Sequence, residues 1–218
     1  MSQPSLRQLF PTVSSALAAD ALDHLNLTNQ CLAPDVVPLS PSHTLLGRAF
    51  CLRAEPAREI RPAVPYQGLL HAMEHVQAGE IVVFGTGRSG AAGVWGELIT
   101  TACRTRRVAG ALTDGLIRDA AKLAGGPFPI FSRGTVPYDS KGRLDVVAYG
   151  EPVTLDGVPI RPGDVLVGDL DGVTVIPAEV TGRVAELVAD KVAAEDAFRA
   201  AVAESGSLAD AFRRYGVL

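Results

Sequence analysis

Apolar residues recur every three or four positions from Leu6 to Leu25, and this spacing predicts an amphipathic helix over residues 5–25. Farther along, short apolar runs bounded by glycine or proline predict strands, and runs with helical spacing separate some of them. The strands are expected at residues 45–53, 81–84, 108–113, 128–132, 143–149, 158–160, 164–168 and 172–176. The intervening helices are expected at residues 66–77, 95–107 and 118–124.

A long alanine-rich helix is predicted from Pro177 to about Glu204, and a last short helix ends at Tyr215. No repeat or low-complexity linker interrupts the chain, so residues 1–218 are expected to form a single domain. Mixed helices and strands come first and a run of strands follows. This order favours an α/β fold built around a mixed sheet, with helical N- and C-terminal extensions.

The chain has 218 residues, of which 47% are hydrophobic and 20% charged, and this composition excludes a disordered protein. The net charge of −4 and the scattered arginines lead us to expect no nucleic-acid partner. No apolar run approaches the ~20 residues that cross a bilayer, and no signal-peptide pattern is present. We therefore expect a cytoplasmic protein without a membrane partner. Cys31, Cys51 and Cys103 lack metal-site spacing and are expected to be buried, reduced side chains.

A glycine-rich loop, Gly85-Thr-Gly-Arg-Ser-Gly90, follows a predicted strand and matches the G-x-G-x-x-G pattern. Asp114 ends the next strand, 24 residues after Gly90. In dinucleotide-binding proteins such glycines let the backbone approach a pyrophosphate, and an acidic residue binds the ribose. This pattern keeps a nucleotide-dependent oxidoreductase open as an alternative, although Gly93 delays the helix that should follow the loop.

Two further patterns indicate other kinds of enzyme. His71-Ala-Met-Glu74-His75 matches the H-x-x-E-H zinc motif, but no third ligand is evident, and an amphipathic helix explains the pattern equally well. A Schiff-base enzyme needs a desolvated lysine. The chain has only three lysines, all in polar or turn-like contexts: Lys122, Lys141 and Lys191.

The most informative pattern joins two segments, Gly96-Glu97-Leu98-Ile99 and Arg118-Asp119, whose first residues are 22 positions apart. The first segment opens a predicted helix, where free backbone N–H groups suit a carboxylate. The second follows a strand and the Asp114-Gly115 turn, which places it at the rim of the sheet. Arginine grips carboxylates and oxo groups with two donors, and an aspartate can hold a hard divalent cation. The alternative is an ordinary surface ion pair.

At these residues the chain resembles the 4-hydroxy-4-methyl-2-oxoglutarate aldolase family, which also contains the regulator of ribonuclease E activity A. The resemblance rests on Gly96–Ile99, on Asp114-Gly115-Leu-Ile-Arg118-Asp119 and on the 22-residue spacing. It extends over most of the chain through further segments: Asp20–Asn26, Pro129–Gly134, Gly163–Pro177 and Tyr215-Gly216.

The resemblance implies a single-domain ββα sandwich like the swivelling phosphohistidine domain, assembled as a homotrimer or hexamer. It implies a metal-dependent pyruvate aldolase that uses no lysine. The substrate would be 4-hydroxy-4-methyl-2-oxoglutarate or a similar 4-hydroxy-2-oxo acid, bound by Gly96, Glu97, Leu98, Ile99 and Arg118. Asp119 would hold Mg²⁺ or Mn²⁺. Glu195, on the helix over about 178–204, matches a glutamate that would reach the site of a neighbouring subunit.

In the reaction so implied, C3–C4 cleavage of a 4-hydroxy-2-oxo acid leaves a pyruvate enolate, which Arg118 and the metal would stabilise. Glu97 would hold the water or hydroxide that removes the 4-hydroxyl proton. Oxaloacetate decarboxylation passes through the same enolate and is expected as a second activity. The competing expectation is a non-catalytic, protein-binding regulator of a ribonuclease, because a fold alone does not decide function.

Overall fold

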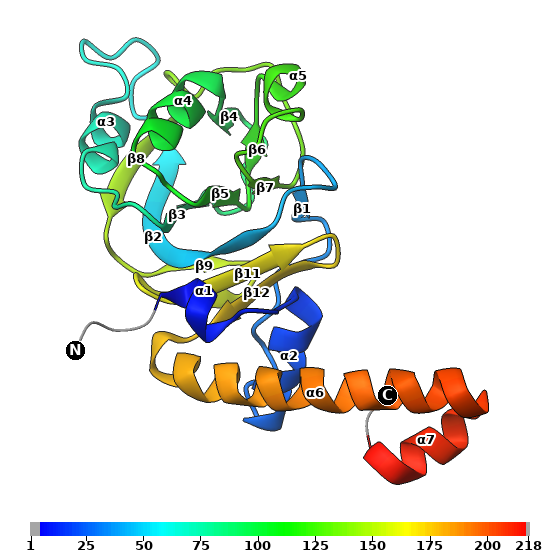
Figure 1. Ribbon diagram of the computed structural model, residues 1–218. Coiled ribbons are helices and arrows are strands. Elements are labelled where there is room, and N and C mark those ends of the chain that lie inside the picture. Colours follow the sequence, from blue (N-terminus) through cyan, green and yellow to red (C-terminus); the bar gives the residue numbers. More distant parts are fainter. Residues whose placement is uncertain (1–4, 217–218) are drawn as a thin grey trace.

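The computed structural model describes residues 5–216 and is organised around an eight-stranded mixed sheet (Figure 1). Four neighbouring strands are parallel: β7, β5, β3 and β2, in that spatial order. Their bounds are β2 (Leu45–Pro56), β3 (Glu80–Gly85), β5 (Gly110–Thr113) and β7 (Ile130–Ser132). Because parallel strands run the same way, the segments that leave β3, β5 and β7 all emerge at one edge of the sheet.

On one of its two sides, the long strand β2 pairs with two different strands in succession. Residues 45–48 pair with β11 (Val165–Asp169), whereas residues 52–56 pair with β8 (Leu144–Tyr149). An irregularity between Arg53 and Ala54 bends the strand there. The sheet is extended by β12 (Gly172–Ile176) beyond β11 and by β1 (Val37–Pro38) beyond β7, both in antiparallel pairing.

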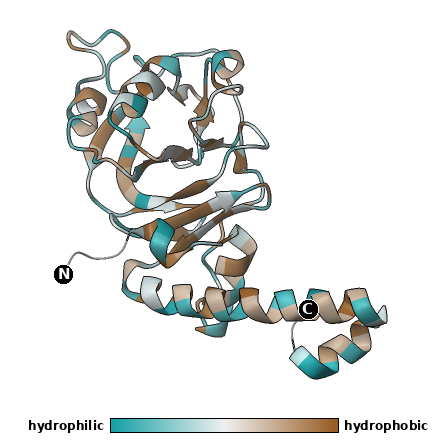
Figure 2. Cartoon of the chain, in the orientation of Figure 1, coloured by the Kyte–Doolittle hydropathy of each residue, from teal (hydrophilic) through white to brown (hydrophobic). Residues whose placement is uncertain are grey.

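Side chains alternate between the two faces of the sheet, so each face has its own core. Hydrophobic residues, coloured brown, recur along the strands of the sheet in Figure 2. Val82 and Phe84 of β3 pack on one side with Trp95, while Ile81 and Val83 pack on the other. The second face is covered by the hairpin of β9 (Val153–Leu155) and β10 (Val158–Ile160).

The N-terminal helices and the C-terminal helix α6 meet beside β11 and β12. The predicted helix over residues 5–25 is two helices, α1 (Leu6–Leu9) and α2 (Ser15–His24), because Pro11 interrupts the first. The backbone N–H and the hydroxyl of Ser15 donate to Asp169 at 2.7 and 2.6 Å. The C-terminal helix α6 (Thr181–Ser205) packs on α2, continues beyond the sheet and turns back as α7 (Leu208–Tyr215) (Figure 1).

The mixed α/β class is confirmed, and the predicted strands at 158–160 and 172–176 coincide with β10 and β12. The likeness to a swivelling phosphohistidine domain remains a prediction. Three helices are shorter than expected, and four short strands were not predicted. The shorter helices are α3 (Gln67–Met73), α4 (Glu97–Thr105) and α5 (Ala120–Leu123). The additional strands are β1, β9, β4 (Gly93–Trp95) and β6 (Leu116–Ile117). Within residues 5–216, no helix is both long and apolar enough to span a bilayer.

One of the three cysteines contradicts the expectation that all are buried. Cys31 is exposed, and its backbone forms an isolated β-bridge with that of Thr174. Cys51 and Cys103 are buried. Burial raises the pKa of both the Cys51 and the Cys103 thiol to about 12. These two side chains are therefore neutral as well as shielded at neutral pH.

We predict that the folded protein reacts with a thiol-specific disulfide reagent at one rapid site at pH 8. Cys31→Ser should abolish the rapid phase, whereas Cys103→Ser should leave it unchanged. Counting released chromophore before and after adding denaturant measures this directly. Rapid reaction of two or three thiols in the folded protein would contradict the burial described here.

Candidate functional site

The site begins with a buried aspartate at the edge where the parallel strands end. Asp114 follows β5 directly and has 0% exposure. Its carboxylate accepts the Thr86 backbone N–H at 2.7 Å, the Thr86 hydroxyl at 2.8 Å and the Arg88 backbone N–H at 2.9 Å. Asp114 thus fastens the loop after β3 to the turn after β5, with charge-assisted hydrogen bonds in place of water.

This arrangement does not meet the requirements of a dinucleotide site. The carboxylate of Asp114 is engaged by the loop itself and is sealed from solvent, so it is not free for a ribose. The glycine-rich loop leads into strand β4, and α4 begins only at Glu97. The loop is therefore not followed directly by a helix whose N-terminus could bind a pyrophosphate.

Beyond the loop and the turn, the chain pairs again. Strands β4 and β6 run parallel, with Trp95 opposite Ile117, and the Arg118 backbone N–H donates to the Trp95 carbonyl at 2.9 Å. This pairing places Gly96 beside Arg118 and Asp119. The two segments that stand 22 residues apart in sequence are therefore adjacent in space, as the sequence predicts.

A hydrogen bond joins the two segments. Asp119 caps α5 in the left-handed conformation (φ 61°), and its Oδ2 accepts the Glu97 backbone N–H at 3.1 Å. A Cβ atom on Gly96 would lie 2.8 Å from the same oxygen. Glycine at position 96 thus allows the Asp119 carboxylate to approach the first turn of α4.

Arg118 lies between two carboxylates. Its Nε is 3.7 Å from Asp119 Oδ2, and its Nη1 is 3.4 Å from Asp139 Oδ1. Asp139 Oδ2 in turn accepts the Tyr66 hydroxyl at 2.5 Å. The guanidinium is thereby oriented from both sides, and about a third of its side chain stays exposed to bind another group.

The same contacts shift two pKa values. The hydrogen bond to Asp139, with help from burial, raises the pKa of Tyr66. Burial alone would raise the pKa of Asp139, but the Tyr66 hydroxyl, the Lys141 backbone N–H and the Arg118 charge outweigh burial and lower it. At neutral pH Tyr66 is therefore a hydrogen-bond donor and Asp139 a carboxylate.

Sequence reasoning missed both Tyr66 and Asp139. Tyr66 precedes α3 and Asp139 lies in the loop between β7 and β8, so 73 residues separate the partners. Tyr66 was expected only as the first residue of the helix over residues 66–77, and Asp139 belongs to no periodic pattern or recognised motif. The sequence offered one signal for this contact, the Asp139-Ser140 pair in the loop that follows β7.

These residues surround a cavity of about 240 Å³. Its polar rim is formed by Arg118, Asp119, Asp139 and the start of α4, and its apolar wall includes Trp95 and Ile99. The first N–H groups of a helix have no acceptor within the helix. Those of Leu98 and Ile99 belong to residues that line the cavity, so this end of α4 can receive an anion.

Two predicted catalytic glutamates lie in different places. Glu97 is at the first turn of α4, and its carboxylate accepts the Thr101 hydroxyl at 3.1 Å. Glu195 lies on the projecting half of α6, paired with Arg199 at 3.4 Å (Figure 1). In one chain the Glu97 backbone N–H contacts Asp119, whereas Glu195 belongs to α6, which lies at the other end of the molecule from α4 (Figure 1).

The donor set fits a hard divalent cation that takes most of its ligands from elsewhere. Among residues 5–216, no three His, Cys, Asp or Glu side chains converge as a complete metal site. Asp119, which lines the cavity, nonetheless has a partly exposed carboxylate. Mg²⁺ is commonly held by one or two carboxylates, with water and substrate oxygens completing an octahedron.

The zinc and lysine interpretations find no support in this geometry. His71 and His75 are exposed and pack against Tyr149, where the His75 Nδ1 contacts the His71 carbonyl. None of the three lysines lines the cavity, and Lys191 pairs with Asp20 on the far side of the sheet.

Comparisons with known proteins place the two site segments within a region shared with a known family. The family model described as Aldolase/RraA, RraA-like, matches residues 15–175. A protein of Halalkalibacterium halodurans, provisionally named 4-hydroxy-4-methyl-2-oxoglutarate aldolase, is 32% identical over 90% of this chain and 88% of its own length. RraAS2 of Streptomyces coelicolor, described as an unusual member of the RNase ES inhibitor RraA protein family, is 29% identical. It superposes with a TM-score of 0.80 over 89% of this chain and 97% of its own. An uncharacterised Pseudomonas syringae protein, 24% identical, shares the fold with a TM-score of 0.83 over 96% of this chain and 99% of its own.

We predict that Asp114→Asn destabilises the protein by about 1–3 kcal/mol, because an amide cannot accept all three hydrogen bonds and its own N–H groups would face donors. Urea unfolding measures the change. Asp171→Asn, in the exposed turn between β11 and β12, is the matched control and should change stability little. Equal effects of the two variants would show that the buried carboxylate does not hold the loop.

Proposed function

The chain belongs to the Aldolase/RraA family, and from that premise we propose that it is a divalent-metal-dependent lyase that cleaves a 4-hydroxy-2-oxo acid to pyruvate. One observation carries the proposal. Arg118, the Asp119 carboxylate and the N-terminus of α4 line the same small cavity, so one 2-oxo acid can meet all three. An ordinary surface ion pair would not be held from both sides or face a helix N-terminus.

The residues divide the substrate between them. Its carboxylate suits the N–H groups at the start of α4, where the helix dipole favours negative charge. Its 2-oxo oxygen would lie within reach of Arg118, which forms ion pairs with Asp139 and Asp119. When the C3–C4 bond breaks, negative charge moves onto the 2-oxo oxygen, and the preorganised guanidinium stabilises that charge.

Proton transfers complete the reaction. The 4-hydroxyl must lose its proton as C3–C4 breaks, and C3 must gain one to give pyruvate. Glu97, the acidic residue of the first turn of α4, holds the water or hydroxide that accepts the hydroxyl proton. Asp119 would hold the divalent cation, Mg²⁺ or Mn²⁺, which supplies Lewis-acid stabilisation when bound. Oxaloacetate decarboxylation yields the same enolate and is a second activity.

Assembly is part of the proposal. The second half of α6 and the helix α7 form an arm that projects from the rest of the chain (Figure 1). On α7 the side chains of Leu208 and Phe212 are 57% and 51% exposed. Apolar side chains on such an arm suit an interface between copies. A homotrimer or hexamer would cover them and bring Glu195 to a neighbour's cavity.

A second function is favoured by the 29% identity to RraAS2 of Streptomyces coelicolor, a member of an RNase inhibitor family. In that case the chain would bind a ribonuclease and turn over no oxo acid. Pyruvate release from oxaloacetate and from a 4-hydroxy-2-oxo acid, measured by a coupled dehydrogenase, separates the two. Absence of pyruvate with Mg²⁺ and with Mn²⁺ would overturn the lyase proposal.

Arg118→Lys should lower kcat by on the order of 10²–10³-fold, with a smaller effect on KM, because a lysine keeps the charge but loses the paired donors. Arg183→Lys, on the exposed face of α6, is the matched control and should behave as the wild type. A raised KM with unchanged kcat would mean that Arg118 binds only the ground state.

Chelation should abolish pyruvate release, and adding Mg²⁺ or Mn²⁺ should restore it. Asp119→Asn keeps a residue that tolerates the left-handed conformation but removes the charge that binds a cation. We expect this variant to stay folded and to need a much higher metal concentration. Full activity of Asp119→Asn at the wild-type metal concentration would show that Asp119 is not the metal ligand.

A further inference from the structure

A second cavity, of about 430 Å³, adjoins the first. Four residues line both: Tyr66, Leu69, Val94 and Ser140. Tyr66 is held at this shared wall by its hydrogen bond to Asp139, which also orients Arg118. The second cavity therefore lies next to the cavity that would hold the 2-oxo acid.

The two cavities differ in size. The first, of about 240 Å³, is smaller than the ~300–1,000 Å³ typical of sites for drug-sized ligands, whereas the second, of about 430 Å³, falls within that range. A short 2-oxo acid needs only the first cavity. The second is thus available to a group attached at the far end of the substrate, at C4.

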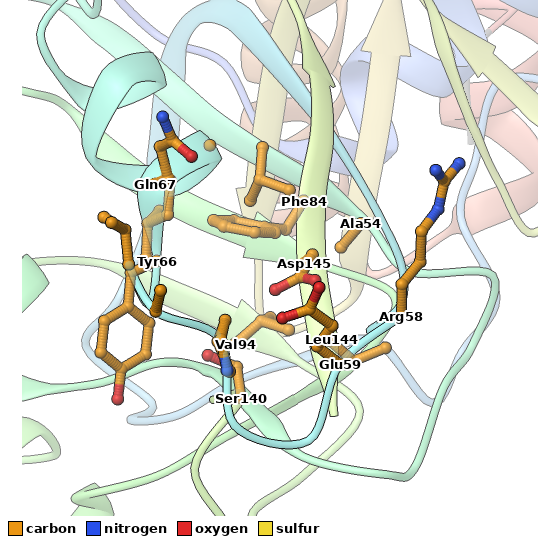
Figure 3. Close-up of a pocket in the computed structure, with 16 residues that line it drawn as sticks. Ala54, Arg58, Glu59, Tyr66, Gln67, Phe84, Val94, Ser140, Leu144 and Asp145 are labelled. Atoms are coloured by element: carbon orange, nitrogen blue, oxygen red, sulfur yellow. The ribbon is translucent and has the colours of Figure 1, made fainter. Parts of the chain in front are cut away.

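The lining of the second cavity selects the chemistry of that group. Its floor is apolar: Phe84 and Leu144 are buried and Val146 is half-buried (Figure 3). Two carboxylates, Glu59 and Asp145, also line it, and the guanidinium of Arg58 extends away from the other labelled residues (Figure 3). An apolar floor with more negative than positive charge disfavours a second carboxylate on the substrate.

From this geometry we infer that the second cavity binds an uncharged, apolar C4 substituent, so the substrates are 4-hydroxy-2-oxo acids with an aryl or branched alkyl group. This inference rests on the proposed lyase function. Cleavage of C3–C4 would transfer the electron pair to C3, release the substituent as an aldehyde and, after protonation at C3, give pyruvate. No oxidant or further reactant is needed.

The test compares two substrates that differ only at C4: 4-hydroxy-2-oxo-4-phenylbutanoate and 4-hydroxy-2-oxopentanoate. We expect kcat/KM to be at least tenfold higher for the phenyl compound in the wild-type protein. Val146→Phe, which fills the second cavity, should lower this ratio at least tenfold. Gln67→Trp, at the exposed rim of the same cavity, obstructs it without altering the core and should lower the ratio as well.

Val147→Phe is the matched control. Val147 follows Val146 on β8, is 46% exposed and lines neither cavity, so the substrate ratio should not change. Oxaloacetate decarboxylation is measured in parallel because it needs only the first cavity. If oxaloacetate is decarboxylated but the phenyl compound has no advantage, or if Val147→Phe lowers the ratio as much as Val146→Phe, the inference is overturned and the lyase proposal stands. If no substrate yields pyruvate, both fail.

Discussion

The buried carboxylate of Asp114 is the interaction on which the site depends. It accepts three hydrogen bonds from the loop after β3, and so binds together two chain segments that leave neighbouring parallel strands. Only beyond this connection do β4 and β6 pair and carry Gly96 to Asp119. The positions of the site residues thus depend on a buried carboxylate. The hydrogen bonds of that carboxylate are made by residues that do not line the cavity.

The sequence predicted the longer strands more accurately than the short strands between them. Strands such as β10 and β12 are apolar runs between turn residues, and this local signal is enough to locate them. Strands β4 and β6 have three and two residues, too few to carry a period, and they exist because each pairs with the other. The break between α1 and α2 at Pro11 was not predicted, because apolar residues keep a helical spacing on both sides of this proline.

Within the site, the Arg118–Asp119 pair and the start of α4 were predicted because each is a contiguous motif. Asp114 was also recognised, but with a ligand-binding role, whereas its partners are the Arg88 backbone N–H, 26 residues earlier, and the Thr86 backbone N–H and hydroxyl, 28 residues earlier. Tyr66 and Asp139 were missed since their contact depends on the fold of two separate loops. Glu195 illustrates a different limit: its predicted role involves a second chain, so the geometry of one chain does not test it.

The closure of the β11–β12 edge has a consequence for how the chain folds during synthesis. Ser15 donates to Asp169, 154 residues later, and α2 is covered by α6. At roughly 5–20 residues per second, the ribosome releases those partners on the order of ten seconds after α2 has emerged. An isolated ten-residue helix is marginal in water, so the N-terminal segment waits as an unstructured chain while the central strands form. Its docking therefore follows the synthesis of β11, β12 and α6.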